Sequence, residues 1–188
     1  MRRIFLIAGM LGLAAFGAGF GQDPNPRVVV ETSMGKITIE LLENKAPITV
    51  KNFLKYVDDK HYDGTIFHRV IADFMIQGGG FEPGLKPKKT RAPIKNEAGN
   101  GLSNVRGTIA MARTEEPDSA TAQFYINVVD NSKDLDRQPG SAGYAVFGQV
   151  VEGMDVVDKI RGVETAKIGG AKNVPVKDVL IKSVRRVK

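Results

Sequence analysis

The sequence contains no cysteine, which excludes disulfides, thiol nucleophiles and thiolate metal sites. It contains no tryptophan and only two histidines, His61 and His68, which are too few for a histidine-rich zinc site. We therefore predict that the protein holds no metal. What is present is an ordinary composition, with 42% hydrophobic and 26% charged residues. Its 188 residues are enough to bury a sizeable core within one domain.

A strong excess of charge of one sign is also lacking. The formal net charge is +6, from 27 basic and 21 acidic residues, and the basic residues are spread along the chain. No zinc-finger or other nucleic-acid-binding motif accompanies them, so we assign them to a solvated surface and expect no nucleic-acid partner. The glycines at 78–80 are followed by no Gly-Lys-Ser/Thr sequence, so they do not indicate phosphate binding.

The first residues differ in character from the rest of the chain. Arg2 and Arg3 precede an apolar run at 4–20 that is rich in glycine and alanine, and polar residues and prolines follow it. This order of a charged start, an apolar run and small residues is typical of a secretory signal. We predict a signal peptide at residues 1–21, a linker at 22–26 and one folded domain at 27–188.

Several alternatives stay open for this segment. Gly19 and Gly21 allow cleavage before Gln22, and a cut between Gly17 and Phe20 is a second option. The apolar run is marginal for a hydrocarbon core of ~30 Å, yet an uncleaved N-terminal membrane anchor is the alternative to a cleaved signal. The paired arginines are similar to a twin-arginine signal, although two positive charges are normal in any signal. We expect an exported protein, either periplasmic or extracellular.

The remaining chain shows the patterns of short strands and two helices. A helix is predicted at 47–59, where Pro47 stands in the first turn and apolar residues recur at i, i+3, i+4 and i+7. A second, shorter helix is predicted at 155–160. Strands are predicted from alternating or β-branched runs at 27–32, 36–42, 66–71, 74–78, 108–112, 123–129, 145–151 and 176–187.

These elements indicate a mostly β fold without an alternating βαβ rhythm. Antiparallel strands of this number close naturally into a barrel, because closure removes exposed strand edges. We therefore predict a closed eight-stranded antiparallel β-barrel capped by two α-helices. The long segment 81–103 has no strong periodicity and is predicted to be a loop.

The segment 67–81 is the most informative part of the chain. It places Arg69 among aromatic, methionine and β-branched residues, and a buried charge is costly unless it has partners. In a hairpin centred near Asp73, Arg69 stands opposite Gln77, close enough for a hydrogen bond. Phe74 and Met75 sit beside the turn, where they can line a pocket.

Strand alternation makes further predictions for this hairpin. Residues i and i+2 share a face of a strand, so Phe67, Arg69 and Ile71 are expected to point together. His68 is expected on the opposite face as a structural histidine. A hydrolase is not indicated, because no nucleophile elbow accompanies His68.

Two later stretches look like contributors to the same pocket. Residues 107–113 form a predicted strand that ends in Arg113. Residues 119–127 lead from small side chains into a strand that carries Gln123 and Tyr125. Small residues before such a strand permit the backbone of a bound peptide to approach.

Together with Val146-Phe147-Gly148 and Glu152-Gly153-Met154, these stretches resemble the signatures of the cyclophilin family of peptidyl-prolyl cis/trans isomerases. The likeness runs in order over about residues 27 to 187, and its motifs are long. The stretches 111–114 and 123–127 are similar to the bacterial branch. The resemblance implies an enzyme that accelerates rotation about X-Pro bonds and needs no cofactor.

The resemblance also implies roles for ten residues. The implied catalytic group consists of the arginine, the glutamine that supports it and a phenylalanine of the apolar wall. The implied substrate residues complete the wall around the proline ring and the groove for the preceding backbone. The catalytic group is Arg69, Gln77 and Phe74, and the substrate-binding residues are Met75, Ala112, Arg113, Gln123, Tyr125, Leu135 and Tyr144.

The chain departs from the family pattern at two of these residues and at one neighbouring position. Tyr125 stands where the family often has phenylalanine, and its hydroxyl needs a partner or water. Asp134, just before Leu135, stands where many eukaryotic members carry tryptophan. Tyr144 occupies a place where many eukaryotic members carry histidine.

The resemblance leaves two functions to weigh. The first is an isomerase that assists the folding of exported proteins, since slow proline isomerisation limits folding. The alternative is a non-catalytic chaperone that binds proline-containing segments with the same groove. In both cases the expected partners are proline-containing peptides and unfolded proteins, and the protein is expected to be a monomer.

Overall fold

The computed structural model describes residues 25–187. The predicted signal peptide at 1–21 therefore lies outside the described residues. Within residues 25–187, none of the helices has the length and the apolar character needed to cross a membrane.

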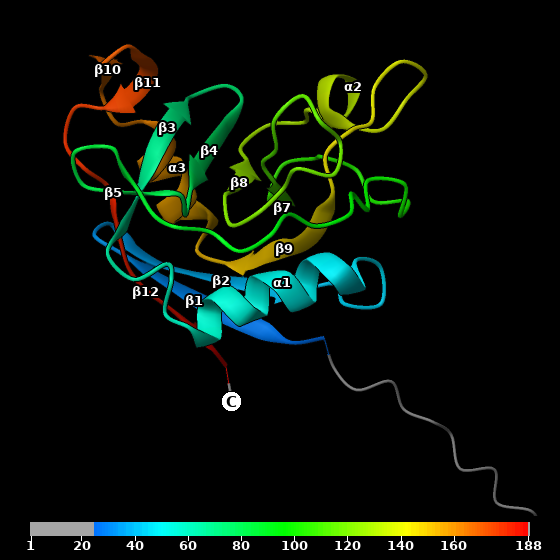
Figure 1. Ribbon diagram of the computed structural model, residues 1–188. Coiled ribbons are helices and arrows are strands. Elements are labelled where there is room, and N and C mark those ends of the chain that lie inside the picture. Colours follow the sequence, from blue (N-terminus) through cyan, green and yellow to red (C-terminus); the bar gives the residue numbers. More distant parts are fainter. Residues whose placement is uncertain (1–24, 188) are drawn as a thin grey trace, which may run out of the picture.

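Eight strands form a closed barrel in the order β1-β12-β3-β4-β8-β7-β9-β2. Every neighbouring pair is antiparallel (Figure 1). The predicted eight-stranded antiparallel barrel is therefore confirmed. Its strands are β1 (Arg27–Thr32), β2 (Gly35–Leu41), β3 (Thr65–Ile71), β4 (Met75–Gly78), β7 (Thr108–Met111), β8 (Phe124–Asn127), β9 (Val146–Glu152) and β12 (Leu180–Arg186).

Two small hairpins lie outside the barrel and were not expected from the sequence. One pairs β5 (Phe81–Glu82) with β6 (Lys86–Pro87), and the other pairs β10 (Thr165–Ile168) with β11 (Ala171–Pro175). The strand predicted at 176–187 begins only at Leu180, because residues 176–179 form a bend after this hairpin.

Three helices accompany the barrel where two were predicted. Helix α1 (Pro47–Asp58) starts at its proline as expected, and α3 (Met154–Arg161) matches the second prediction. The additional helix α2 (Ser132–Leu135) has only four residues. So short a helix shows no periodicity, which is why the sequence pattern did not predict it.

The core fills the barrel and joins it to both longer helices. Along β1 and β2 every second residue is fully buried, as an antiparallel strand with one buried face requires. Phe53 of α1 packs against Tyr62, Phe124 and Phe147, with ring centroids 5.1, 5.7 and 5.2 Å away. Apolar residues of α3 join the same cluster, and α3 lies behind β3 and β4 in the view of Figure 1.

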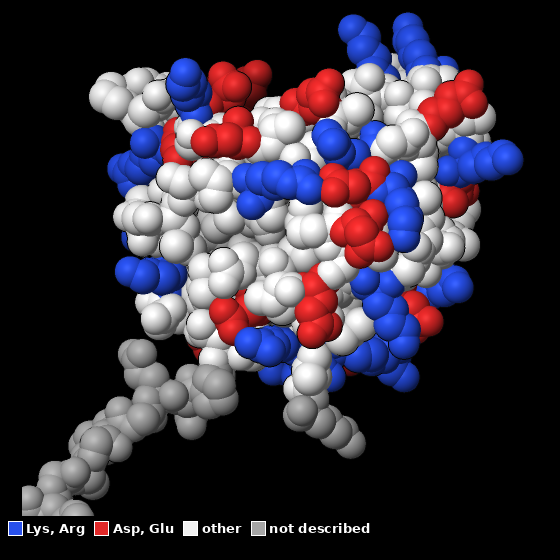
Figure 2. All heavy atoms as spheres, turned by 180° about the vertical axis from the view of Figure 1, so that it is seen from behind, with Lys and Arg blue, Asp and Glu red and all other residues white. Residues whose placement is uncertain are grey.

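Ion pairs join the last strand to the end of the first helix and to the turn that follows it. Arg186 of β12 contacts Asp58 of α1 at 2.7 Å, and Arg185 contacts Asp63 at 2.6 Å. Seen from behind, basic and acidic side chains lie interspersed on the surface (Figure 2). On that face the molecule shows no segregation of charge by sign.

A β-bulge at His68 changes which side chains of β3 share a face. Arg69 pairs with Gln77, as predicted, but Phe67 pairs with Gly78, so His68 is the extra residue. Phe67 is therefore buried in the barrel core together with Val70, and it does not point with Arg69. The predicted shared face of Phe67 and Arg69 is wrong, because the bulge breaks the strict alternation.

The bulge also overturns the predicted separation of His68 from Arg69. Both side chains line one hollow of roughly 420 Å³ on the outside of β3, with Phe81 as their neighbour. The His68 and Phe81 rings lie 4.6 Å apart, and His68 is only 9% exposed. Burial lowers the pKa of His68 from its ordinary 6.5 to about 4.

This pKa shift predicts a loss of stability in mild acid. Between about pH 6.5 and pH 4 the unfolded chain binds a proton at His68 and the folded chain does not. The contribution of His68 to the free energy of unfolding should therefore be fully present near pH 7. As the pH falls through this window, the free energy of unfolding should fall by about 3 kcal/mol. Urea titrations at several pH values should show that the free energy of unfolding of His68→Gln falls clearly less with decreasing pH than that of the wild type. Equal pH slopes for the two proteins would contradict the assignment.

Candidate active site

Nine of the ten predicted site residues line one pocket of roughly 200 Å³ on the outside of the barrel. They come from the β3–β4 hairpin, from β8, from α2, from the segment after β7 and from the segment before β9. The tenth, Gln123, is partly exposed and is hydrogen-bonded to the pocket residue Gln77. The lining residues are Arg69, Phe74, Met75, Gln77, Ala112, Arg113, Tyr125, Leu135 and Tyr144.

The apolar part of the pocket is a small cluster separate from the barrel core. Met75, Tyr125 and Leu135 are buried there, and Phe74 packs against them half-exposed. Barrel register creates this arrangement, since β4 and β8 run antiparallel with Met75 opposite Asn127 and Gln77 opposite Tyr125. The result is an apolar wall with an amide and a guanidinium at its edge.

Arg69 is a half-buried cation that an amide orients. Its Nη1 donates a hydrogen bond to Gln77 Oε1 at 3.3 Å, and Gln77 Nε2 donates to Gln123 Oε1 at 2.9 Å. No carboxylate of residues 25–187 forms an ion pair with Arg69. The relay therefore fixes the direction of the guanidinium without neutralising its charge.

A glycine makes room for this relay. A Cβ atom at Gly80 would lie 2.5 Å from Cγ of Gln123, closer than carbon atoms pack. Gly80 thus serves close packing against Gln123.

The hydroxyl of Tyr125 has a buried partner. It donates a hydrogen bond of 2.7 Å to Asn104 Oδ1, and Asn104 is fully buried. Burial raises the pKa of Tyr125 far above its ordinary value, so the hydroxyl keeps its proton and acts as a donor. Sequence reasoning missed Asn104, although the need for a partner to Tyr125 was the signal that could have led to it.

Tyr144 and Arg113 form the other end of the pocket. The Arg113 guanidinium lies 4.4 Å from the centre of the Tyr144 ring, and its Nε donates to the carbonyl oxygen of Gly143 at 3.0 Å. Tyr144 in turn meets Tyr125 edge to face, with ring centroids 6.0 Å apart. The structure thus brings these distant residues together, as the sequence predicted.

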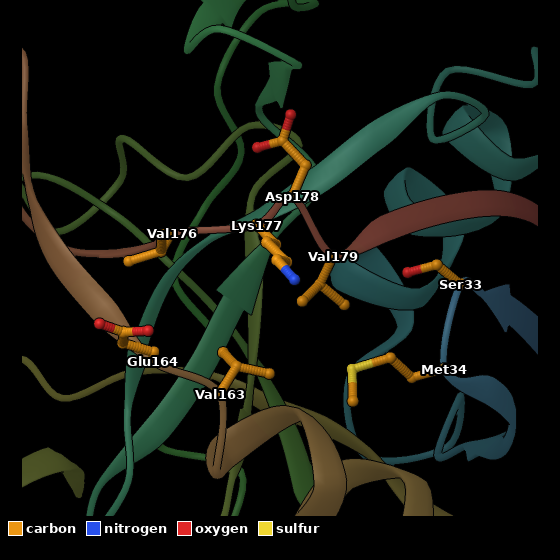
Figure 3. Close-up of a pocket in the computed structure, with 8 residues that line it drawn as sticks. All are labelled: Ser33, Met34, Val163, Glu164, Val176, Lys177, Asp178 and Val179. Atoms are coloured by element: carbon orange, nitrogen blue, oxygen red, sulfur yellow. The ribbon is translucent and has the colours of Figure 1, made fainter.

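A larger hollow of roughly 400 Å³ lies elsewhere and contains none of the predicted site residues. The β1–β2 turn, the segment after α3 and the segment before β12 supply its walls (Figure 3). Its apolar residues are Met34, Val163, Val176 and Val179, and its polar residues are Ser33, Glu164, Lys177 and Asp178. Size alone therefore does not identify the functional site.

Comparison with known proteins agrees with this geometry. The model of the family described as cyclophilin type peptidyl-prolyl cis-trans isomerase/CLD matches residues 27–186. A peptidyl-prolyl cis-trans isomerase of Acinetobacter baylyi is 55% identical, over 98% of this chain and 95% of its own. Isomerase A of Dickeya dadantii is 51% identical over 100% and 98%, and isomerase B of Escherichia coli is 59% identical over 84% and 97%.

A solved structure shows the same fold. A cyclophilin-type isomerase of Cryptosporidium parvum, determined in the presence of the dipeptide Ala-Pro, superposes with a TM-score of 0.72. It is 25% identical and covers 84% of this chain and 96% of its own. The chain therefore belongs to the cyclophilin family and is a cyclophilin-type peptidyl-prolyl cis-trans isomerase.

Proposed function

We propose that Arg69 is the catalytic group of this isomerase and that the apolar pocket beside it holds the proline ring. The observation that carries the proposal is the guanidinium at the edge of the apolar wall, which Gln77 orients and no carboxylate of the described residues neutralises. A cation in this position costs free energy in the empty protein and becomes useful when a peptide excludes water from the pocket.

The physical task is to stabilise a twisted peptide bond. Resonance between nitrogen and carbonyl gives an uncatalysed barrier of about 18–20 kcal/mol. Rotation localises the lone pair on the prolyl nitrogen, which can then accept a hydrogen bond from Arg69. Because this interaction is stronger in the twisted state than in either planar isomer, it lowers the barrier. The rigid, always charged guanidinium suits this role.

The rest of the groove supports a proline-containing peptide as the substrate. Phe74, Met75, Tyr125 and Leu135 supply the apolar wall for the ring. Ala112, Arg113 and Gln123 lie beside it and would receive the backbone that precedes the proline. The C. parvum relative studied with Ala-Pro supports the same class of ligand. Because one chain supplies the whole pocket, we propose that the protein acts as a monomer.

We further propose that the protein is exported and assists the folding of exported proteins. The charged and apolar residues 1–21 support this, and the segment is distinct from the domain that the family model matches. The A. baylyi and D. dadantii relatives align over 98% and 100% of the chain, whereas the E. coli isomerase B covers 84%. The alignments to the A. baylyi and D. dadantii relatives therefore extend into the N-terminal segment.

Arg69→Ala should lower kcat/KM for an X-Pro peptide by about 100-fold, because one preorganised donor to a transition state contributes that much. Arg69→Lys should stay at least ~10-fold impaired, since lysine keeps the charge but loses the rigid fork. Peptide isomerisation followed by exchange NMR measures both variants.

Arg27→Ala is the matched control, because Arg27 pairs with Glu40 on the exposed surface away from the pocket. It should change kcat/KM by less than about twofold. Near-normal turnover by Arg69→Ala with an intact fold would remove Arg69 from the catalytic role.

Expression of the full chain in a Gram-negative host tests export. Fractionation followed by N-terminal sequencing should find the protein in the periplasm, beginning near Gln22. An uncleaved chain that begins at Met1 and is found in the membrane fraction would identify an N-terminal anchor instead. An uncleaved chain in the cytoplasm would contradict the export proposal.

A further inference from the structure

We propose that Asn104 is the positioning residue of the proline pocket, and that its buried side chain fixes two walls of the pocket relative to each other. The inference rests on the proposed function, in which Tyr125 and Leu135 receive the proline ring. Asn104 touches neither Arg69 nor the pocket surface. It acts on the site through the residues to which it is hydrogen-bonded.

The two walls belong to separate segments that Asn104 bridges. Its Oδ1 accepts the hydroxyl hydrogen of Tyr125 at 2.7 Å, which fixes the far end of the ring supplied by β8. Its backbone N and its Nδ2 both donate to Asp136 Oδ1, at 2.7 and 2.9 Å. Asp136 directly follows Leu135, so these bonds anchor the short helix α2 that carries the second wall.

The hydrogen-bonding capacity of the Asn104 amide is fully used. Oδ1 also accepts from Asn127 Nδ2 at 3.2 Å, and Nδ2 also donates to the carbonyl oxygen of Tyr144 at 3.3 Å. An amide has two acceptor and two donor positions, so all four are occupied. Such a network in a dry interior is rigid when complete and costly when one member is lost.

The same network reaches the third wall. Asn127 Oδ1 accepts from Asn131 Nδ2 at 2.7 Å, and Asn131 Nδ2 also donates to the carbonyl oxygen of Phe74 at 2.7 Å. Asn127 and Asn131 are fully or almost fully buried. Asn104 therefore stands at one end of a chain of three asparagines, Asn104, Asn127 and Asn131, whose hydrogen bonds reach Tyr125, the residue after Leu135, and Phe74.

This arrangement predicts an effect on binding rather than on the chemical step. The apolar walls contact the proline ring and not the rotating peptide bond, so they bind the cis, trans and twisted states equally. Loosening them removes uniform binding, which raises KM and leaves kcat nearly unchanged. Loss of Arg69 should lower kcat and leave KM nearly unchanged. A failure of this proposal and a failure of the catalytic assignment therefore give different kinetic results.

The test is a double-mutant cycle with Asn104→Ala, Tyr125→Phe and the double variant. KM and kcat for an X-Pro peptide are measured together with the peptide Kd by titration. Asn104→Ala should raise KM and Kd about 5- to 10-fold with kcat changed by less than about twofold. Tyr125→Phe, which removes only one hydroxyl, should raise both about threefold and stays informative if Asn104→Ala fails to fold.

The decisive value is that of the double variant. Its KM should equal that of Asn104→Ala to within about a factor of two, because both changes break the same bond. Asn52→Ala is the matched control, since Asn52 is a buried amide that donates to the carbonyl oxygen of Thr121 outside the pocket. The control should lower stability without moving KM.

Two results would overturn the proposal. In one, the effects of Asn104→Ala and Tyr125→Phe multiply, which would show that Asn104 acts independently of the ring. In the other, Asn104→Ala changes KM and Kd no more than Asn52→Ala does, which would reduce Asn104 to a purely structural role.

Discussion

The hydrogen bond between Arg69 and Gln77 is the constraint around which the functional part of this molecule is arranged. It places a cation at the edge of an apolar pocket with an amide as its partner, and the amide orients the charge without cancelling it. The barrel supplies this bond, because the β3–β4 register sets the two residues opposite each other. The bulge at His68 then turns Phe67 into the core while Arg69 stays on the outer face.

Two polar networks divide the work of the site. The relay from Gln123 through Gln77 ends at Arg69, the group proposed to act on the prolyl nitrogen. The asparagine network lies on the other side of the pocket wall and reaches no charged donor of the site. The first network thus orients the guanidinium of Arg69, and the second holds the apolar walls of the pocket in place. Both networks contain amides. The amides satisfy buried partners without themselves adding charge, and the asparagine network also includes the carboxylate of Asp136.

The residues that could be predicted are those with a local pattern. The pairing of Arg69 with Gln77 followed from the position of the turn, and the barrel followed from eight short strands of the right character. The bulge at His68 could not be predicted, because no residue type in the sequence marks it. Asn104 lies in a loop without periodicity, and Leu135 lies on a helix of four residues, so only tertiary structure shows what they contact.

The central claim is that orientation of Arg69, and not its charge alone, produces catalysis. Gln77→Met tests it most directly, because it keeps the length of the side chain and removes the acceptor that orients the guanidinium. Exchange NMR on a saturating X-Pro peptide measures the rate of isomer interconversion on the protein. We predict that this rate falls about 10-fold while the peptide Kd stays within about twofold. An unchanged rate with unchanged Kd would contradict the account.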